Sequence, residues 1–183
     1  MGKVREPRID YDGRHLVDAH WRHTPRRIVI HDTEGLDAPG IRDLQGLAEF
    51  FKRQGLGYGY HVAVDATGLS ARLVDDRFMA WHVQGQNTDS LGVSMIAQAR
   101  FPRVTWLSRP RQLHKVARWL AWWHVEYGIP LTIVRELGGE GVLTHRIASQ
   151  LDGAGGSDHS DPGPDFPLLM VLYLARRYAK RGW

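Results

Sequence analysis

Hydrophobic residues recur along this chain with the periods of strands and of helices. The β-rich run at 27–31, with three consecutive apolar residues at its centre, predicts a central strand that is buried on both faces. Alternation of apolar and polar residues over 58–64 predicts a half-buried strand, with 69–74 as its hairpin partner. Further short strands are expected at 79–82, 91–97 and 131–134.

Apolar positions spaced three and four residues apart predict three helices. The first covers about 41–53 and the last about 167–180. The longest covers about 109–127 and ends at Gly128, a natural C-terminal stop. Its three tryptophans indicate a core helix rather than a ligand site, because such rings bury large apolar areas. Residues 150–161 are expected to form a loop.

Strands and helices are mixed along the chain, without an internal repeat or a linker. This order predicts a single α/β domain with a central mixed β-sheet flanked by helices. The 183 residues are enough for one core without disulfide support. Residues 1–24 are polar and poorly periodic, so we expect an N-terminal extension packed over a domain at 25–183.

Composition narrows the class of protein. Hydrophobic residues make up 43% and charged residues 24%, the balance of an ordinary soluble domain. No apolar run approaches the ~20 residues of a membrane span, and residues 1–10 have no apolar core of the secretory type. We therefore expect no signal peptide, no stable membrane insertion and, at this size, a monomer.

The net charge of +4 favours anionic partners such as nucleic acid, a membrane surface or a cell wall rich in carboxylates and phosphates. No nucleic-acid-binding motif and no basic tail is found, so nucleic acid is not expected as a partner. The chain has no cysteine. Any zinc would have to be bound by histidine and carboxylate.

Three polar residues follow apolar segments or lie on a loop, where function is common. His31 ends the most apolar strand, His145 ends a short apolar segment, and Asp161 precedes the last helix. Two histidines and a carboxylate suffice for a catalytic zinc site with water in the fourth position. Their spacing has no local signature, and a strand-end histidine is more often structural. On the residues alone, both interpretations stay open.

Six segments occur in an order that is similar to a known family. They are 28–33, 58–62, 80–83, 90–93, 144–146 and 159–167. The order resembles the zinc N-acetylmuramoyl-L-alanine amidases of the amidase-2 family, which are related to peptidoglycan recognition proteins. The resemblance covers about 25–175, and its most specific part is Asp-Pro-Gly-Pro-Asp-Phe-Pro at 161–167.

The resemblance implies that 25–183 is an amidase catalytic domain. It implies cleavage of the amide bond between N-acetylmuramic acid and L-alanine of the stem peptide, with bacterial peptidoglycan as substrate and Zn²⁺ as cofactor. His31, His145 and Asp161 match the family's zinc ligands. The glycine-rich loop before His159 and the lack of an export signal resemble phage endolysins, which implies synthesis in the host cytoplasm and action on the wall after release.

The same resemblance points to two catalytic residues. Tyr60 matches a tyrosine near the metal, and His159 lies two positions before the third ligand, where many members have lysine. The family often has a glutamate in the strand that here contains Ser94 and Met95. We therefore expect His159, with Tyr60, to stabilise the oxyanion and protonate the leaving amine. Gly153–Gly156 would let the loop move over substrate, or form a plain surface loop.

Three further residues are candidates for substrate binding, each with an alternative. His82 lines the groove or bonds to its own loop. Arg146 binds a peptide carboxylate or is an ordinary surface arginine. Asp32 lies near the site, where it either orients His31 or forms the turn. Tyr60 itself has a core alternative beside Val62.

Other functions remain as alternatives. Relatives of this fold that bind the cell wall without catalysis lack the third ligand, so Asp161 argues against a binding module. A structural zinc with a closed fourth position is disfavoured by only three ligands and no cysteine.

Overall fold

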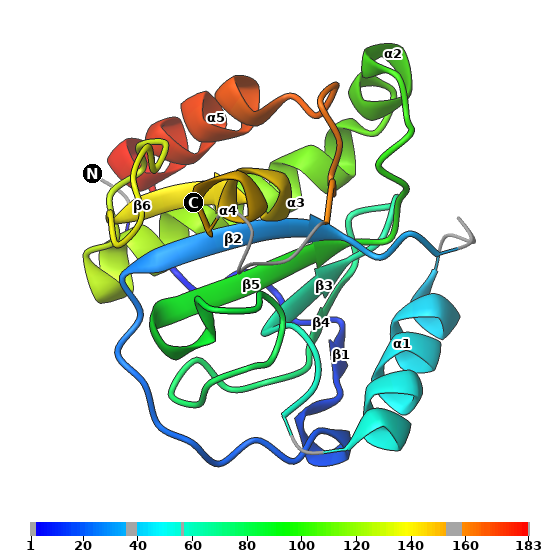
Figure 1. Ribbon diagram of the computed structural model, residues 1–183. Helices are drawn as coiled ribbons and strands as arrows, with labels where there is room; N and C mark the ends of the chain where they lie inside the picture. Colours follow the sequence, from blue (N-terminus) through cyan, green and yellow to red (C-terminus); the bar gives the residue numbers. More distant parts are fainter. Residues whose placement is uncertain (1–2, 36–39, 56, 153–158, 183) are drawn as a thin grey trace.

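The computed structural model describes residues 3–35, 40–55, 57–152 and 159–182, and these form a sheet with helices on both faces (Figure 1). The strands are β1 (Tyr11–Asp12), β2 (Arg27–Asp32), β3 (Val62–Val64), β4 (Ser70–Arg72), β5 (Ser90–Met95) and β6 (Gly141–Thr144). The helices are α1 (Ile41–Gln54), α2 (Arg103–Leu107), α3 (Pro110–Tyr127), α4 (His145–Asp152) and α5 (Leu168–Arg181). Two short 3-10 helices cover Arg14–Leu16 and Asn87–Asp89.

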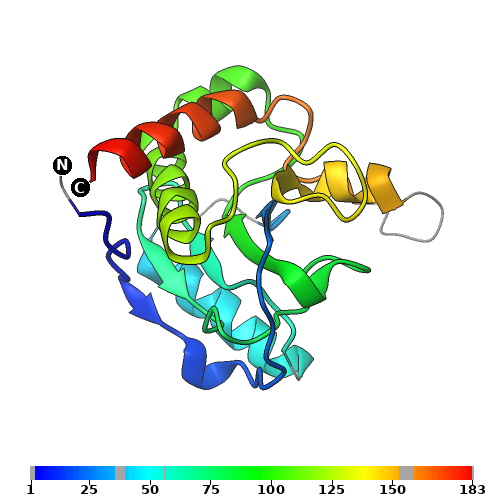
Figure 2. The same ribbon diagram turned by 90° about the vertical axis from the view of Figure 1, so that its left-hand side faces the viewer.

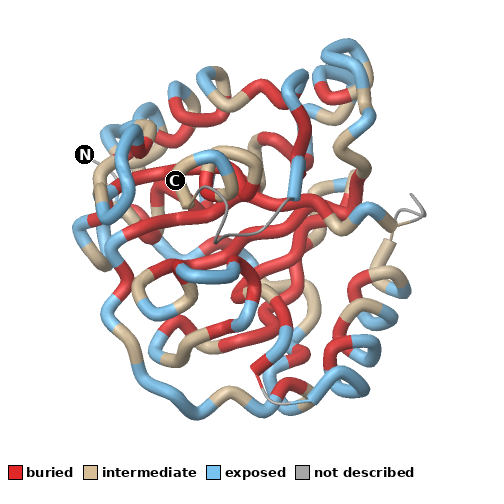
Figure 3. Tube along the Cα trace, viewed as in Figure 1, coloured by how far each residue is buried: buried red, intermediate tan, exposed pale blue. Residues whose placement is uncertain are grey.

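The sheet is mixed, with the strand order β1-β4-β3-β5-β2-β6. Strand β2 pairs in parallel with β5 on one side and β6 on the other, and β3 also pairs in parallel with β5. Only the β3–β4 hairpin is antiparallel. All six residues of β2 are buried, as its continuous apolar pattern predicts, and Figure 3 shows buried residues along the central strands. The predicted α/β fold with a central mixed sheet is confirmed.

Alternate residues of β2 separate the two faces of the sheet. Ile28 and Ile30 face the core formed with α3 and α5, whereas Val29 packs with residues of α4. Helix α1 contributes Leu44, Ala48 and Phe51 to a further cluster with Ala63 of β3. Helices α3 and α5 therefore cover one face of the sheet, and α1 and α4 cover the other (Figures 1 and 2).

The three predicted helices are confirmed within one or two residues. They correspond to α1, α3 and α5. Helix α3 ends at Gly128, which has a left-handed conformation (φ 74°) and donates its N–H to the carbonyl of His124. Trp119 and Trp123 are fully buried, so the tryptophan-rich helix is a core element as predicted.

Two predicted strands are wrong, and those expected at 58–64 and 69–74 are shorter than predicted. Residues 79–82 form no strand, because their backbone bonds to two separate loops: Met79 donates to Trp21 and Trp81 donates to Gly57. Residues 131–134 make only a single bridge to β6. The strand expected at 58–64 is limited to β3. Alternation of apolar and polar residues does not show how far the neighbouring strands extend, and these pair with β3 only at Val62–Val64.

The loop expected at 150–161 begins later than predicted, because α4 runs to Asp152. The hydroxyl of Thr144 accepts the N–H of Ile147 in the first turn, and Ala148 packs on the sheet. The short helix α2 after Pro102 was also not predicted. Gly153–Gly156, where loop movement was expected, lie outside the described residues.

The N-terminal segment does more than pack over the domain. Strand β1 pairs in parallel with β4 and extends the sheet, and the N–H of Asp10 donates to the carbonyl of Ser70. The boundary between residues 24 and 25 stays a prediction. None of the helices in the described ranges combines the length and the apolar character needed to cross a membrane.

Candidate active site

Three elements bring His31, His145 and Asp161 to one place. His31 lies near the carboxyl end of β2, and His145 follows directly after β6. Because β2 and β6 are parallel neighbours, their carboxyl ends lie at the same edge of the sheet. Asp161 reaches this edge from the loop before α5, where its backbone carbonyl accepts the N–H of Arg146 at 2.9 Å. The three residues lie 130 positions apart at most.

Their side chains converge on a common point. Nδ1 of His31 lies 3.1 Å from Nδ1 of His145 and 3.2 Å from Oδ2 of Asp161, and Nδ1 of His145 lies 3.1 Å from Oδ1 of Asp161. Ligands at the ~2.0–2.2 Å usual for zinc in a tetrahedron lie roughly 3.3–3.5 Å from one another. The three separations are close to that value, so the buried group is suited to a metal ion.

The hydrogen bonding of the group also leaves room for a cation. Among the described residues, Oδ1 of Asp161 is buried without a hydrogen-bond partner. Burial acts to raise the pKa of Asp161, but the adjacent rings of His145 and His31 outweigh it and lower that pKa. Burial lowers the pKa of His31 to about 4. An ionised carboxylate beside neutral imidazoles is the form that binds zinc.

Gly163 of the Asp-Pro-Gly-Pro motif holds the Asp161 loop in place. Its φ is 83°, and its N–H donates to the carbonyl of Ser160 at 2.8 Å. A Cβ at this position would collide with the backbone carbonyl of Ala99. The motif is therefore specific for glycine here both by conformation and by space.

We expect Gly163→Ala to lower the free energy of unfolding by about 2–3 kcal/mol, because it combines a left-handed φ with a backbone collision. Denaturant titration measures the change. Gly46→Ala in α1 is the matched control, since Gly46 has open space around it, and it should stabilise the helix by about 0.5–1 kcal/mol. Equal stability of the Gly163→Ala protein and the parent would contradict this account of the motif.

A chain of hydrogen bonds leads from His31 into the protein. Nε2 of His31 lies 3.0 Å from Nδ1 of His82, and Nε2 of His82 lies 3.2 Å from Oγ of Ser90. The hydroxyl of Ser90 donates to the carbonyl of Gln86 at 2.6 Å. Arg27 holds the side chain of Gln86 through a 2.6 Å hydrogen bond.

This chain determines which nitrogen of His31 carries hydrogen. The single hydroxyl hydrogen of Ser90 is used by Gln86, so Ser90 accepts from Nε2–H of His82. Nδ1 of His82 is then an acceptor, and Nε2 of His31 donates to it. The opposite direction would place two lone pairs against each other between His82 and Ser90. Nδ1 of His31, which faces the other two candidate ligands, is therefore left with its lone pair.

Glycine makes room for this chain. A Cβ on Gly92 would lie 2.8 Å from the ring of His82. His61 accepts the N–H of Gly92 through Nδ1 and bonds to the carbonyl of Phe78 through Nε2. Both of its ring nitrogens are occupied by backbone groups, so His61 has a structural role.

A cleft of about 620 Å³ opens beside the candidate ligands; His145 and Asp161 line it, and His31 is buried behind them. Its lining includes Tyr60, Trp81, His82, His159, Asp32 and Glu34. The cleft is far larger than a metal ion requires, so it has room for a segment of substrate beside the ion.

The two residues expected to be catalytic both lie at this cleft. The ring of Tyr60 lies 4.9 Å from that of His31, and burial raises the pKa of Tyr60, which keeps its hydroxyl protonated as a donor. The ring of His159 stacks on His145, with centroids 4.4 Å apart, and its side chain is 62% exposed. Tyr60 is thus half-buried beside His31, and His159 faces the open side.

The structure distinguishes the three candidates for substrate binding. His82 lines the cleft and bonds to His31. Asp32 also lines the cleft, but its Oδ1 accepts the N–H of Glu34, which is the turn role, and burial raises its pKa to about 8. The side chain of Arg146 is not among the described residues that line the cleft, although its backbone binds the Asp161 loop.

Sequence reasoning missed two groups of residues. Ser90 and Gln86 complete the hydrogen-bond chain, and their signal was the polar loop directly after His82. Glu34 lines the cleft with a left-handed φ of 50°, an unusual conformation for a residue other than glycine. Ser94, in the strand where the family often has a glutamate, is buried opposite His31 in the β2–β5 register.

The sequence pattern of the N-acetylmuramoyl-L-alanine amidase family, amidase-2, matches residues 21–164. The chain belongs to this family. Its membership confirms the resemblance inferred from the six ordered segments and supports peptidoglycan amidase activity, with peptidoglycan as the substrate. Among curated proteins, none matches the sequence.

Solved structures of an amidase, a hydrolase and an endolysin have the same fold. The endolysin amidase LysCS from Clostridium intestinale has a TM-score of 0.63 at 18% identity, over 93% of this chain and 97% of that one. The hydrolase AmiA of Staphylococcus aureus, solved with its ligand, has 0.66 at 19% identity, over 98% and 90%. The Ph2119 endolysin of a Thermus scotoductus bacteriophage has 0.62 at 16% identity, over 92% and 99%.

Proposed function

We propose that this member of the family is a zinc-dependent N-acetylmuramoyl-L-alanine amidase that hydrolyses the amide bond between N-acetylmuramic acid and L-alanine of the stem peptide. The observation that carries the proposal is the convergence of two imidazoles and a carboxylate, 3.1–3.2 Å apart, at the base of the cleft. This donor set suits a catalytic zinc better than a structural one, since three protein ligands leave one position for water.

His31, His145 and Asp161 would hold the zinc. When bound, zinc supplies Lewis-acid polarisation of the scissile carbonyl and lowers the pKa of water. The chain's own contribution is to keep the three donors in place. His82, Ser90 and Gln86 fix the hydrogen on Nε2 of His31, and the backbone N–H of Arg146 fixes the Asp161 loop.

Tyr60 and His159 would handle charge and protons. The protonated hydroxyl of Tyr60 lies beside His31 and would donate to the oxyanion that forms at the attacked carbonyl. His159 lies on the solvent side of His145, where it would deliver a proton to the leaving amine of alanine. With Ser94 in place of a glutamate, no carboxylate is supplied from that strand position.

The test is digestion of purified peptidoglycan with and without removal of the metal. The parent protein should release new alanine amino termini and lactyl carboxylates, identified by mass spectrometry. A chelator should abolish this release, and added zinc should restore it. If the zinc-loaded protein binds the wall but does not cleave it, the proposal of an amidase is wrong and the protein is a binding module of the same fold.

We expect His82→Ala to weaken zinc binding by about 10–100-fold, the usual effect of removing the hydrogen-bond partner of a metal-binding histidine. Ser90→Ala should act in the same direction with a smaller effect, because it removes only the acceptor of His82. Chelator competition measures affinity, and ¹⁵N NMR of the ring nitrogens reports the tautomer of His31.

Ser70→Ala is the matched control for the serine variant. Ser70 is buried and donates its hydroxyl to a backbone carbonyl, that of Arg8, away from the cleft. The Ser70→Ala variant should leave zinc affinity and the His31 tautomer unchanged. An unchanged His31 tautomer in both the His82 and the Ser90 variants would show that the hydrogen-bond chain does not set it.

We further propose that the protein acts in bacterial lysis, made in the host cytoplasm and released to the wall as phage endolysins are. The support is the similarity of fold to two endolysins. Zinc dependence and cleavage can be tested independently of this point.

A further inference from the structure

The positive charge of this protein is concentrated on two helices. Helices α3 and α5 carry seven of the 24 Lys and Arg and one of the 20 Asp and Glu, Glu126. Elsewhere 17 Lys and Arg stand against 19 Asp and Glu, so the rest of the chain is slightly negative. The net charge of +4 therefore comes entirely from one layer of the fold.

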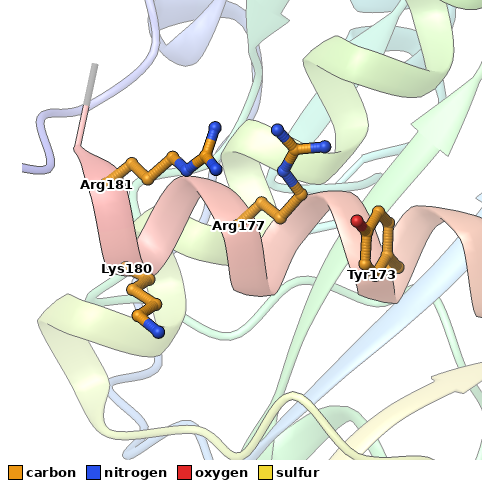
Figure 4. A pocket seen from close by; sticks show the side chains of 4 residues that line it. All are labelled: Tyr173, Arg177, Lys180 and Arg181. Carbon is orange, nitrogen blue, oxygen red and sulfur yellow. The ribbon is translucent and has the colours of Figure 1, made fainter.

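Five of these cations, which we call the basic face, lie on the two packed helices: Arg111 and Arg118 on α3, and Arg177, Lys180 and Arg181 on α5. All five are exposed. Tyr178 joins the two helices, because its hydroxyl lies 2.6 Å from Nδ1 of His114 and the guanidinium of Arg118 lies over its ring. Figure 4 shows Tyr173, Arg177, Lys180 and Arg181 from the middle to the C-terminal end of α5, where they line a shallow pocket.

Several arginines elsewhere on the surface are held by carboxylates, whereas these cations are not. Exposed Arg14, Arg26 and Arg77 are paired with carboxylates at 2.6–2.8 Å. Within the described ranges, no carboxylate lies within 4.0 Å of the five residues of the basic face. Unpaired, clustered guanidinium groups suit an anionic partner, and their planar forks match carboxylates in pairs of hydrogen bonds.

The basic face lies across the sheet from the cleft. Helices α3 and α5 pack on the Ile28 and Ile30 side, whereas His31 lies on the same side of β2 as Val29. A short substrate in the cleft cannot reach α5 through the sheet. A cross-linked wall can contact the cleft and α5 at the same time, because its neighbouring strands surround the protein.

Resting on the proposed function, we propose that the basic face binds the carboxylates of stem peptides on peptidoglycan strands other than the one being cut. Stem peptides recur along each peptidoglycan strand, so the basic face can form several weak ion pairs with the carboxylates of one strand. The second contact raises the local concentration of the enzyme on the wall without changing the chemistry in the cleft.

The test compares Arg177→Gln/Lys180→Gln/Arg181→Gln with a control of equal charge change, Arg5→Gln/Lys52→Gln/Arg53→Gln, whose residues are exposed on other parts of the protein. Binding is measured by brief cosedimentation at 4 °C with sacculi freed of phosphate polymers by hydrofluoric acid. The α5 variant should bind at least about ten-fold more weakly at low salt, and the difference should vanish near 1 M salt, where the Debye length is ~3 Å. The control should bind like the parent.

Turnover of a small soluble muropeptide is the second measurement. Both triple variants should cleave it at the parental rate, because the basic face is remote from the cleft. Equal binding of the two triple variants to stripped sacculi would overturn the proposal. So would a difference seen only with phosphate-bearing walls, anionic vesicles or DNA. Failure of the parent to cleave muropeptide would instead refute the proposed function and leave the binding result standing.

Discussion

Replacing Asp161 with alanine is expected to abolish measurable zinc retention and to lower amidase turnover by more than a hundred-fold. Loss of a group that only orients a ligand costs about 10–100-fold in affinity or activity, so loss of a ligand itself should cost more. The carboxylate contacts both His31 and His145, and nothing else described at this point carries a negative charge so close to both rings. Metal analysis after dialysis and release of alanine amino termini measure the two effects.

Asp165→Ala is the matched control for this prediction. Asp165 lies in the same loop and is exposed, and the contact of this residue with Arg103 uses its backbone carbonyl. Its replacement should leave zinc content and turnover unchanged. An Asp161→Ala protein that retains stoichiometric zinc and parental turnover would remove Asp161 from the site.

The second large effect is expected for His159→Ala, with turnover reduced about 10²–10⁴-fold and zinc retained. His159 stacks on His145 but its Nδ1 lies 3.6 Å from Asp161, too far for a hydrogen bond, so the three ligands should stay in place without it. The loss should fall on kcat more than on KM, because proton delivery to the leaving amine matters in the transition state.

Lysine at the same position supplies the decisive comparison. His159→Lys keeps a proton donor on the open side of the cleft and should recover at least about ten-fold of the turnover lost in His159→Ala. His20→Ala, at another exposed histidine, should have no effect. If alanine and lysine variants are equally slow with full zinc, the role of His159 is tied to its imidazole ring and not to proton delivery; if both are fast, it has no catalytic role.

Local patterns predicted much of the fold. The apolar run of β2 and the helical periods of α1, α3 and α5 are strong because each element buries one stripe or both faces against a core. The short strands were predicted less well. Residues 79–82 bond through their backbone to two separate loops, and periodicity does not distinguish that from pairing in a sheet.

The candidate site was predicted in part. His31, His145, Asp161, Tyr60 and His159 were selected by matching neighbours in sequence, and the structure brings all of them to one cleft. The expected substrate role of Arg146 has no support from the cleft lining, and it remains a prediction. The roles of Ser90 and Gln86 could not be assigned from the sequence. The Ser90 hydroxyl and the Gln86 carbonyl act on the site only through their hydrogen bonds to each other and to His82, which the fold creates.

The sequence by itself determined the class of fold, the helices that form the core, the absence of thiolate ligands and the membership of an amidase family. These follow from periodicity, composition and ordered motifs, which are properties of the chain itself. The tertiary structure alone decided which nitrogen of His31 faces the other ligands, and that the positive charge lies on one face. Both depend on residues far apart in the chain, such as His31 and His82, separated by 51 positions. Hydrogen-bond direction and charge clustering are set by distances in space.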